Sequence, residues 1–156
     1  MLRTKKRLWI CYILLILNLT FIWGNSLLPG EISGAFSDWV KDLLAPLFGQ
    51  QPGSPGGGGL LRKLAHFTEF TCLGLCLRWL FGMLKKKPWE YLALPLLCGI
   101  AAASIDETIQ RFVPLRGPSI KDVGIDTSGV ILGIAIISLT QVIKNRKSKI
   151  MEENKL

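Results

Sequence analysis

Four long apolar stretches dominate the chain, and short polar or basic segments separate them. The stretches cover residues 8–23, 64–84, 89–106 and 123–143. Each is near the ~20 residues that an α-helix needs to cross ~30 Å of hydrocarbon. Because lipid offers no partner for backbone N–H and C=O groups, each stretch is predicted to be a transmembrane helix. The pattern therefore predicts an all-α membrane protein, a four-transmembrane-helix bundle that forms a single domain over residues 1–156.

A further helix is predicted in the loop that follows the first stretch, over residues 35–47. Its apolar residues fall on one stripe: Phe36, Val40, Leu43, Leu44 and Leu47. A helix with one apolar stripe lies in the membrane interface, with that stripe in the lipid. Residues 49–60 are rich in glycine and proline and are predicted to form a flexible loop.

The composition agrees with a membrane protein and argues against a nucleic-acid partner. The chain is 49% hydrophobic, with a mean hydropathy of +0.38. Its net charge is +8, but the basic residues separate the apolar stretches and form no basic patch with groove-reading neighbours. The four cysteines lie inside apolar runs, and no disulfide framework is expected.

The distribution of basic residues predicts the orientation. Twelve of the 19 lysine and arginine residues lie in residues 1–7, 85–87 and 144–156, and six lie in the other two loops. Basic residues are enriched in cytoplasmic loops, so both termini and the tail at 144–156 are predicted to be cytoplasmic. The first stretch lacks a convincing small-x-small cleavage site and is predicted to be an uncleaved anchor. Arg78, inside the second stretch, is expected to snorkel to the basic side.

Polar side chains gather where the other three apolar stretches meet the opposite, outward side of the membrane. They are Lys63, His66, Glu69, Asp106, Glu107, Gln110, Asp122 and Asp126. At ~1.5 Å per residue, Asp126 lies about 25 Å and Asp106 about 22 Å from the inner boundary. Charged groups at this depth are rare unless they are paired, hydrated or used. Three helices are thus predicted to bring carboxylates to one level, just inside the outer interface.

Helical spacing places members of this cluster on shared faces. Arg62, His66 and Glu69 are spaced i, i+4 and i+7. Asp126 shares a face with Gly129, the first glycine of a Gly-xxx-Gly repeat that lets a neighbouring helix approach closely. These faces are therefore expected to turn into the bundle.

Two roles for the cluster are open. One histidine with several carboxylates is able to bind a divalent cation such as Mg²⁺, Mn²⁺ or Zn²⁺, or to supply a general acid and base. A buried ion-pair network that sets helix register is the alternative. The stiff turn at residues 112–118 is predicted to bring Arg116 back over the carboxylates. The candidate catalytic residues are His66, Glu69, Asp106, Glu107 and Asp126. The candidate binding residues are Lys63, Gln110, Arg116 and Asp122.

Three spaced motifs resemble the signature of the VanZ-like family. They are Lys63-x-x-His66-Phe67-x-Glu69-Phe70, Asp106-Glu107-x-x-Gln110-x-Phe112-x-Pro114-x-Arg116 and Asp122-x-x-x-Asp126-x-x-Gly129-x-x-x-Gly133. Asn25-Ser26 with Pro29 is similar to that family's Ser-x-x-Pro feature, which adds Ser26 to the candidate binding residues. The resemblance implies a small polytopic protein of the bacterial cytoplasmic membrane. The family's namesake is associated with lowered susceptibility to the lipoglycopeptide teicoplanin, and no catalytic mechanism comes with the resemblance.

The leading hypothesis is a VanZ-like bacterial membrane protein that affects sensitivity to teicoplanin-like antibiotics. Its outward-facing polar site is expected to act on a lipid or lipid-linked envelope component. The expected partners are the lipid bilayer and a lipid-linked envelope precursor or a lipoglycopeptide. A metal-dependent membrane hydrolase or transferase on an amphiphilic substrate, and a structural or partner-binding bundle, are the two alternatives.

Overall fold

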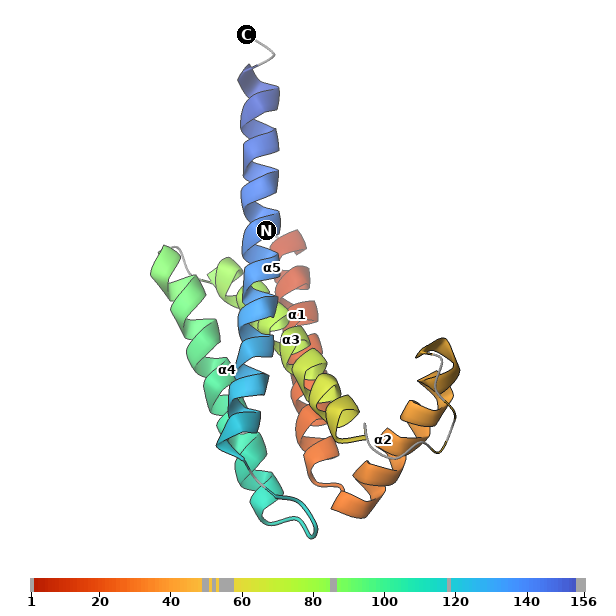
Figure 1. The fold of residues 1–156 in the computed structure, drawn as a ribbon. Helices are drawn as coiled ribbons and strands as arrows, with labels where there is room; N and C mark the ends of the chain where they lie inside the picture. The colour runs from red at the N-terminus through yellow and green to blue at the C-terminus, as the bar shows by residue number, and fades with distance from the viewer. Residues whose placement is uncertain are drawn as a thin grey trace.

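The structure, a computed structural model, describes residues 2–48, 51, 53, 58–84, 87–117 and 119–153. This part of the chain contains α-helices and one short 3₁₀ helix, and no strand. The elements are α1 (Leu2–Ser26), α2 (Gly30–Leu44), η1 (Ala45–Phe48), α3 (Gly58–Leu84), α4 (Pro88–Arg111) and α5 (Ile120–Glu153). Helices α1, α3, α4 and α5 form a bundle, and α2 projects from one end of it (Figure 1).

Among the residues that the structure describes, four helices are long and apolar enough to cross a membrane. These spans are Thr4–Ser26, Gly59–Leu84, Trp89–Arg111 and Ile120–Glu152. Large apolar side chains such as Leu17, Leu97 and Leu139 are exposed on the outside of the bundle, where a lipid bilayer covers them. The chain is therefore an all-α, multi-pass membrane protein, as the apolar stretches predicted.

The helices extend beyond the predicted stretches. Helix α5 begins three residues before the predicted start at residue 123 and continues to Glu153, so most of the tail at 144–156 is helical. Within the predicted flexible loop at 49–60, the structure describes residues 51, 53 and 58–60, and the last three already belong to α3. Hydropathy detects the apolar part of a helix, whereas the hydrogen-bonded backbone continues through polar residues at both ends.

The amphipathic helix starts earlier than predicted. Helix α2 begins at Gly30, directly after Pro29, and ends at Leu44, two residues before Pro46. Pro46 has no backbone N–H and cannot donate to the carbonyl of Asp42, so the α-helical hydrogen bonding stops there and the chain continues as the 3₁₀ turn η1. None of the α2 side chains is buried. The apolar stripe is therefore free to contact lipid.

The core lies between the four long helices. Its buried residues are Ile22, Phe70, Leu73, Leu77, Ala102, Ala103, Val130 and Ile134. Helix α5 approaches α3 closely at two of its glycines, as the Gly-xxx-Gly spacing predicted. A Cβ atom on Gly129 would lie 2.5 Å from the Phe67 carbonyl oxygen, and one on Gly133 would meet the backbone of Thr71. This close approach packs residues 129–133 of α5 against residues 67–75 of α3.

The loop between α4 and α5 packs on the junction of α1 and α2. The Gly30 N–H donates a hydrogen bond to the Pro114 carbonyl oxygen at 3.0 Å. Leu115 adopts a left-handed backbone conformation with φ 58°, which is uncommon outside glycine. The loop thereby joins α4 and α5 to the junction of α1 and α2 at this end of the bundle.

Arg78 lies inside the bundle, and the prediction that it snorkels to the membrane surface is wrong. The residue is 2% exposed. Its Nε donates to Ser138 Oγ at 3.0 Å, its Nη2 donates to Gln141 Oε1 at 2.7 Å, and its guanidinium lies 4.3 Å from the centre of the Tyr91 ring. These neutral partners on two neighbouring helices stabilise the buried charge.

Candidate functional site

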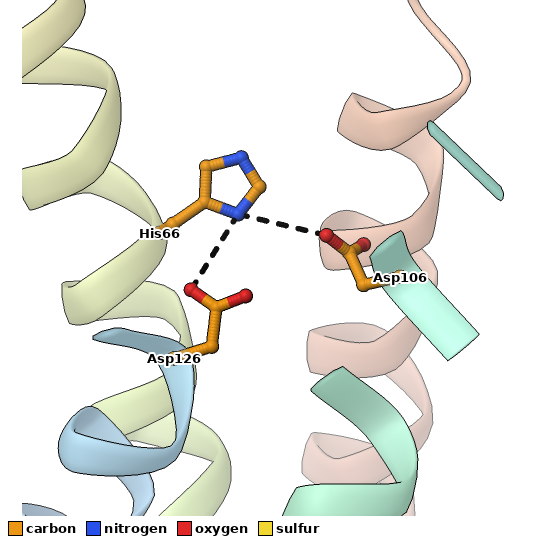
Figure 2. Close-up of side chains that lie close together, drawn as sticks. All are labelled: His66, Asp106 and Asp126. Atoms are coloured by element: carbon orange, nitrogen blue, oxygen red, sulfur yellow. Dashed lines mark ion pairs between the residues drawn. The ribbon is translucent and has the colours of Figure 1, made fainter. Parts of the chain in front are cut away.

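Three helices bring one histidine and two aspartates together near the α2 end of the bundle. His66 comes from α3, Asp106 from α4 and Asp126 from α5, and their polar atoms converge (Figure 2). His66 Nδ1 lies 3.7 Å from Asp106 Oδ2 and 3.9 Å from Asp126 Oδ1. Both distances exceed those of hydrogen bonds. The side chains of Asp106 and Asp126 are 0% and 1% exposed, so the charges lie out of contact with solvent.

Gln110 orients Asp106 through a chain of hydrogen bonds. Arg62 Nη2 donates to Gln110 Oε1 at 2.9 Å, and Gln110 Nε2 donates to Asp106 Oδ2 at 2.8 Å. Because a guanidinium only donates, the Gln110 oxygen must point to Arg62 and its NH₂ group to Asp106. The same NH₂ group donates to the buried Ser26 Oγ at 3.3 Å. Ser26 thus joins α1 to the cluster.

Asp126 has no such support. Neither of its carboxylate oxygens accepts a hydrogen bond within the described part of the chain, and Asp106 Oδ1 accepts none either. Buried polar groups without partners are uncommon in folded proteins, and each one requires a physical explanation. These oxygens are therefore available to a ligand.

Glu69 and Glu107 have partners that connect helices. Glu69 Oε1 accepts a hydrogen bond from Asn25 Nδ2 at 3.0 Å, which ties α3 to the end of α1. Glu107 Oε2 accepts from the Ser119 backbone N–H at 2.8 Å, immediately before α5 begins. A carboxylate at a helix N-terminus is stabilised by the helix dipole. The contacts of both glutamates suit a structural role.

A small cavity beside His66 and Asp126 leads toward the surface. It has a volume of about 20 Å³, counted as space for the centre of a water molecule. More than ~10–15 Å³ on this measure accommodates one water. Lys63 and Asp122 line it on the solvent side, where Lys63 Nζ lies 3.8 Å from Asp122 Oδ1 and their side chains are 52% and 26% exposed.

Arg116 lies close enough to the carboxylates for its charge to act on Glu69, Asp106 and Glu107, as predicted, but it donates its hydrogen bonds elsewhere. Its Nε donates to the Leu28 carbonyl oxygen at 3.1 Å, and its Nη2 donates to the Asn25 carbonyl oxygen at 2.8 Å. The last carbonyls of a helix lack intrahelical partners, so Arg116 caps the end of α1. Burial lowers the pKa of its guanidinium, and the charge of nearby Arg62 lowers it further. The contacts of Arg116 are those of a structural clamp.

Comparison with known proteins assigns the chain to a family. A family model described as VanZ/LLP1 matches residues 8–141. The chain belongs to the VanZ/LLP1 family. No curated protein and no solved structure matches the chain. All the polar residues of the cluster fall inside the region that the VanZ/LLP1 model matches.

The VanZ/LLP1 cluster combines an excess of carboxylates with few permanent cations. Within the described residues it contains five carboxyl groups and three basic groups other than histidine. The carboxyl groups are those of Glu69, Asp106, Glu107, Asp122 and Asp126, and the basic groups are those of Arg62, Lys63 and Arg116. An excess of buried negative charge requires a bound cation, a proton or both. The chemistry open to the cluster is therefore cation binding and proton transfer.

Two residues with direct contacts in the cluster were not among the candidates from sequence. Arg62 lies one turn before His66 on the same stripe, and this spacing was the available signal. Asn25 precedes Ser26 in the Ser-x-x-Pro feature, but its pairing with Glu69 depends on how α1 packs against α3.

Proposed function

We propose that this VanZ/LLP1 protein alters the sensitivity of a bacterium to lipoglycopeptide antibiotics such as teicoplanin, through a site that acts on a lipid or lipid-linked envelope component. The observation that carries the proposal is the cluster of buried carboxylates around His66, reached by a cavity with Arg62 and Lys63 in its lining. Its place near the end of three apolar helices suits an amphiphile, whose chain contacts the helices while its polar group reaches the cluster.

The site is proposed to face outward from the bacterial cytoplasmic membrane. Two observations support this orientation: the bias of lysine and arginine toward residues 1–7, 85–87 and 144–156, and the position of both chain ends at the end of the bundle opposite α2 (Figure 1). The cluster then lies at the outer interface, where lipid-linked envelope precursors are exposed to the antibiotic.

Cysteine labelling is expected to confirm this topology. The four native cysteines are free, so a variant with all four replaced serves as the background. A cysteine introduced at position 56 should react with a membrane-impermeant maleimide on intact cells, and one added at the C-terminus should react only after lysis. Labelling of the C-terminal cysteine on intact cells would reverse the orientation and contradict an outward-facing site.

Expression in a susceptible bacterium tests the function. The wild-type protein is expected to raise the inhibitory concentration of teicoplanin several-fold, with little effect on the same glycopeptide without its acyl chain. Asp126→Asn and His66→Ala should each remove this effect while the protein accumulates normally. Asp38→Asn, on the exposed surface of α2, is the matched control and should behave as wild type. An unchanged inhibitory concentration with abundant wild-type protein would rule out the proposal.

Stability measurements on the same variants separate a functional site from a scaffold. If the cluster only holds the helices together, removing one partner leaves a buried charge that costs about 3–5 kcal/mol. Thermal stability would then fall in parallel with the effect on teicoplanin. If the cluster is a functional site, Asp126→Asn nearly preserves the shape of the side chain and should lose function with stability intact.

A further inference from the structure

We propose that His66, Asp106 and Asp126 form a binding site for one divalent cation of the Zn²⁺ or Mn²⁺ type. The inference concerns the same cluster as the proposed function and gives it a chemical identity. The inference is argued from the positions of protein atoms, so metal binding can be tested separately from the effect on antibiotics.

The spacing of the three polar atoms fits an ion between them. The two distances from His66 Nδ1 are 3.7 and 3.9 Å, and all three ligand atoms lie within 4.8 Å of one another. A point equally far from three atoms with such separations lies about 2.1–2.5 Å from each. Metal–ligand distances in proteins are ~2.0–2.2 Å for Zn²⁺ with nitrogen or oxygen and ~2.3–2.6 Å for Ca²⁺. The gaps that are too long for hydrogen bonds therefore match a shared cation.

The unpartnered oxygens provide a second, independent observation. Asp126 is 1% exposed and lines the cavity, and within the described part of the chain neither of its carboxylate oxygens accepts a hydrogen bond. Asp106 is 0% exposed, and among the same residues its Oδ1, the oxygen beside the one that faces His66, has no partner. A buried carboxylate without a partner is costly, and a metal ion is one of the few groups that compensates it.

The other charged groups of the cluster are already engaged. Arg62 binds Gln110, and Arg116 binds carbonyl oxygens at the end of α1. The remaining carboxylates each have a donor or a cation: Glu69 has Asn25, Glu107 has the Ser119 N–H, and Asp122 has Lys63. Among the described residues, Asp126 is thus the buried carboxylate with neither a hydrogen-bond donor nor a lysine or arginine partner, and Asp106 beside it has only the neutral Gln110.

The surroundings hold the three ligands in place. Gln110 orients Asp106 by donating to the oxygen that faces His66, as residues around metal sites commonly do for the ligands. Asp126 lies one turn before Gly129, where α5 contacts the backbone of α3 beside Phe67, the residue after His66. The site is therefore built on rigid helices.

The donor set and the cavity indicate the kind of cation. One imidazole nitrogen with two carboxylate oxygens suits Zn²⁺ or Mn²⁺ better than Mg²⁺ or Ca²⁺, which prefer oxygen ligands alone. Three protein ligands leave at least one coordination position open. The cavity beside His66 and Asp126 has room for a water or a substrate oxygen at that position.

Metal analysis of the purified protein tests the site. The protein is prepared without a histidine tag, treated with EDTA, and returned to Zn²⁺ or Mn²⁺ in detergent or nanodiscs. We expect about one tightly bound ion per chain and a thermal midpoint that rises with cation concentration, since a ligand that binds the folded state stabilises it. Asp106→Asn and Asp126→Asn should each weaken binding by at least about tenfold. Asp38→Asn should retain the bound ion.

NMR of the wild-type protein tests metal binding even if these variants fail to fold. His66 is the only histidine in the chain, so ¹⁵N-labelled histidine gives a single imidazole signal from the wild-type protein. Titration with Zn²⁺ should shift that signal in a saturable way, and EDTA should reverse the shift. The absence of a saturable shift, or an ion that the Asp106→Asn/Asp126→Asn double variant retains, would overturn the proposal.

The metal and antibiotic experiments distinguish the two proposals. Metal binding with no effect on teicoplanin sensitivity supports the cation site and overturns the proposed function. An effect on teicoplanin sensitivity in a protein that binds no metal overturns the cation site alone.

Discussion

Replacing Arg116 with alanine is expected to destabilise the bundle by about 3 kcal/mol, because two charge-assisted hydrogen bonds at ~1.5–3 kcal/mol each are lost. Arg116 is 8% exposed and donates to the carbonyl oxygens of Asn25 and Leu28. Without it, the carbonyl oxygens of Leu28 and Asn25 each lose a hydrogen bond in a partly buried place, and Asn25 keeps the one from the Leu28 N–H. Thermal or chemical unfolding of the purified protein measures the loss.

Arg111→Ala is the matched control for this prediction. Arg111 is the last residue of α4, and its side chain is exposed. Replacing it with alanine removes the same charge from the same end of the bundle. Its replacement should change stability by less than about 0.5 kcal/mol, the usual range for surface positions. Arg116→Lys should recover only part of the stability, because an ammonium does not reproduce the fork of a guanidinium. Equal stability of the two alanine variants would show that Arg116 does not clamp α1, and would return it to the candidate binding residues.

The four-helix architecture could be predicted from the sequence because its cause is simple. An apolar run near 20 residues has only one stable form in lipid, and each of the four runs forms a helix. The ends of the helices were less predictable, since hydrogen bonding continues through polar residues. Arg78 could not be placed because its partners, Ser138, Gln141 and Tyr91, come from helices 13 or more residues away.

The gathering of the polar residues could also be predicted, because depth along a helix follows from counting residues. Asp106 and Asp126 were expected at one level, and both lie beside His66. The exact hydrogen-bond partners depend on how each helix is rotated about its own axis. The sequence predicts this rotation only where a residue such as Gly129 marks the face that packs against a neighbouring helix. Glu69 lies on the stripe of His66, yet it points to Asn25 of α1.

The hydrogen-bond partners of Arg116 could not be predicted from the turn that carries it. The sequence predicts a stiff return after α4, and the loop does return across the end of the bundle. Its hydrogen bonds go to carbonyls at the end of α1, because the last carbonyls of a helix lack intrahelical partners and attract a cation. Nothing in the spacing of the motif distinguishes these two targets.

The second large effect is expected at Gly133, where adding one methyl group should push two helices apart. A Cβ atom at this position would lie 2.6 Å from the Leu75 backbone nitrogen and would overlap the Thr71 carbonyl oxygen. Both neighbours belong to the backbone of α3, which has no rotamer with which to move aside. Overpacking of this kind costs about 1–3 kcal/mol, so Gly133→Ala should lower the free energy of unfolding by about 2 kcal/mol.

Gly124→Ala is the control and should have the opposite sign. Gly124 lies on the same helix, but a Cβ atom there would meet nothing within 4 Å. Alanine favours the helical state over glycine by up to about 1 kcal/mol, so this variant should be as stable as wild type or more stable. Thermal unfolding of both variants under the same conditions measures the difference. If Gly133→Ala were stabilising too, helix propensity would dominate over packing, and the close approach of α3 and α5 that holds Asp126 near His66 would be wrong.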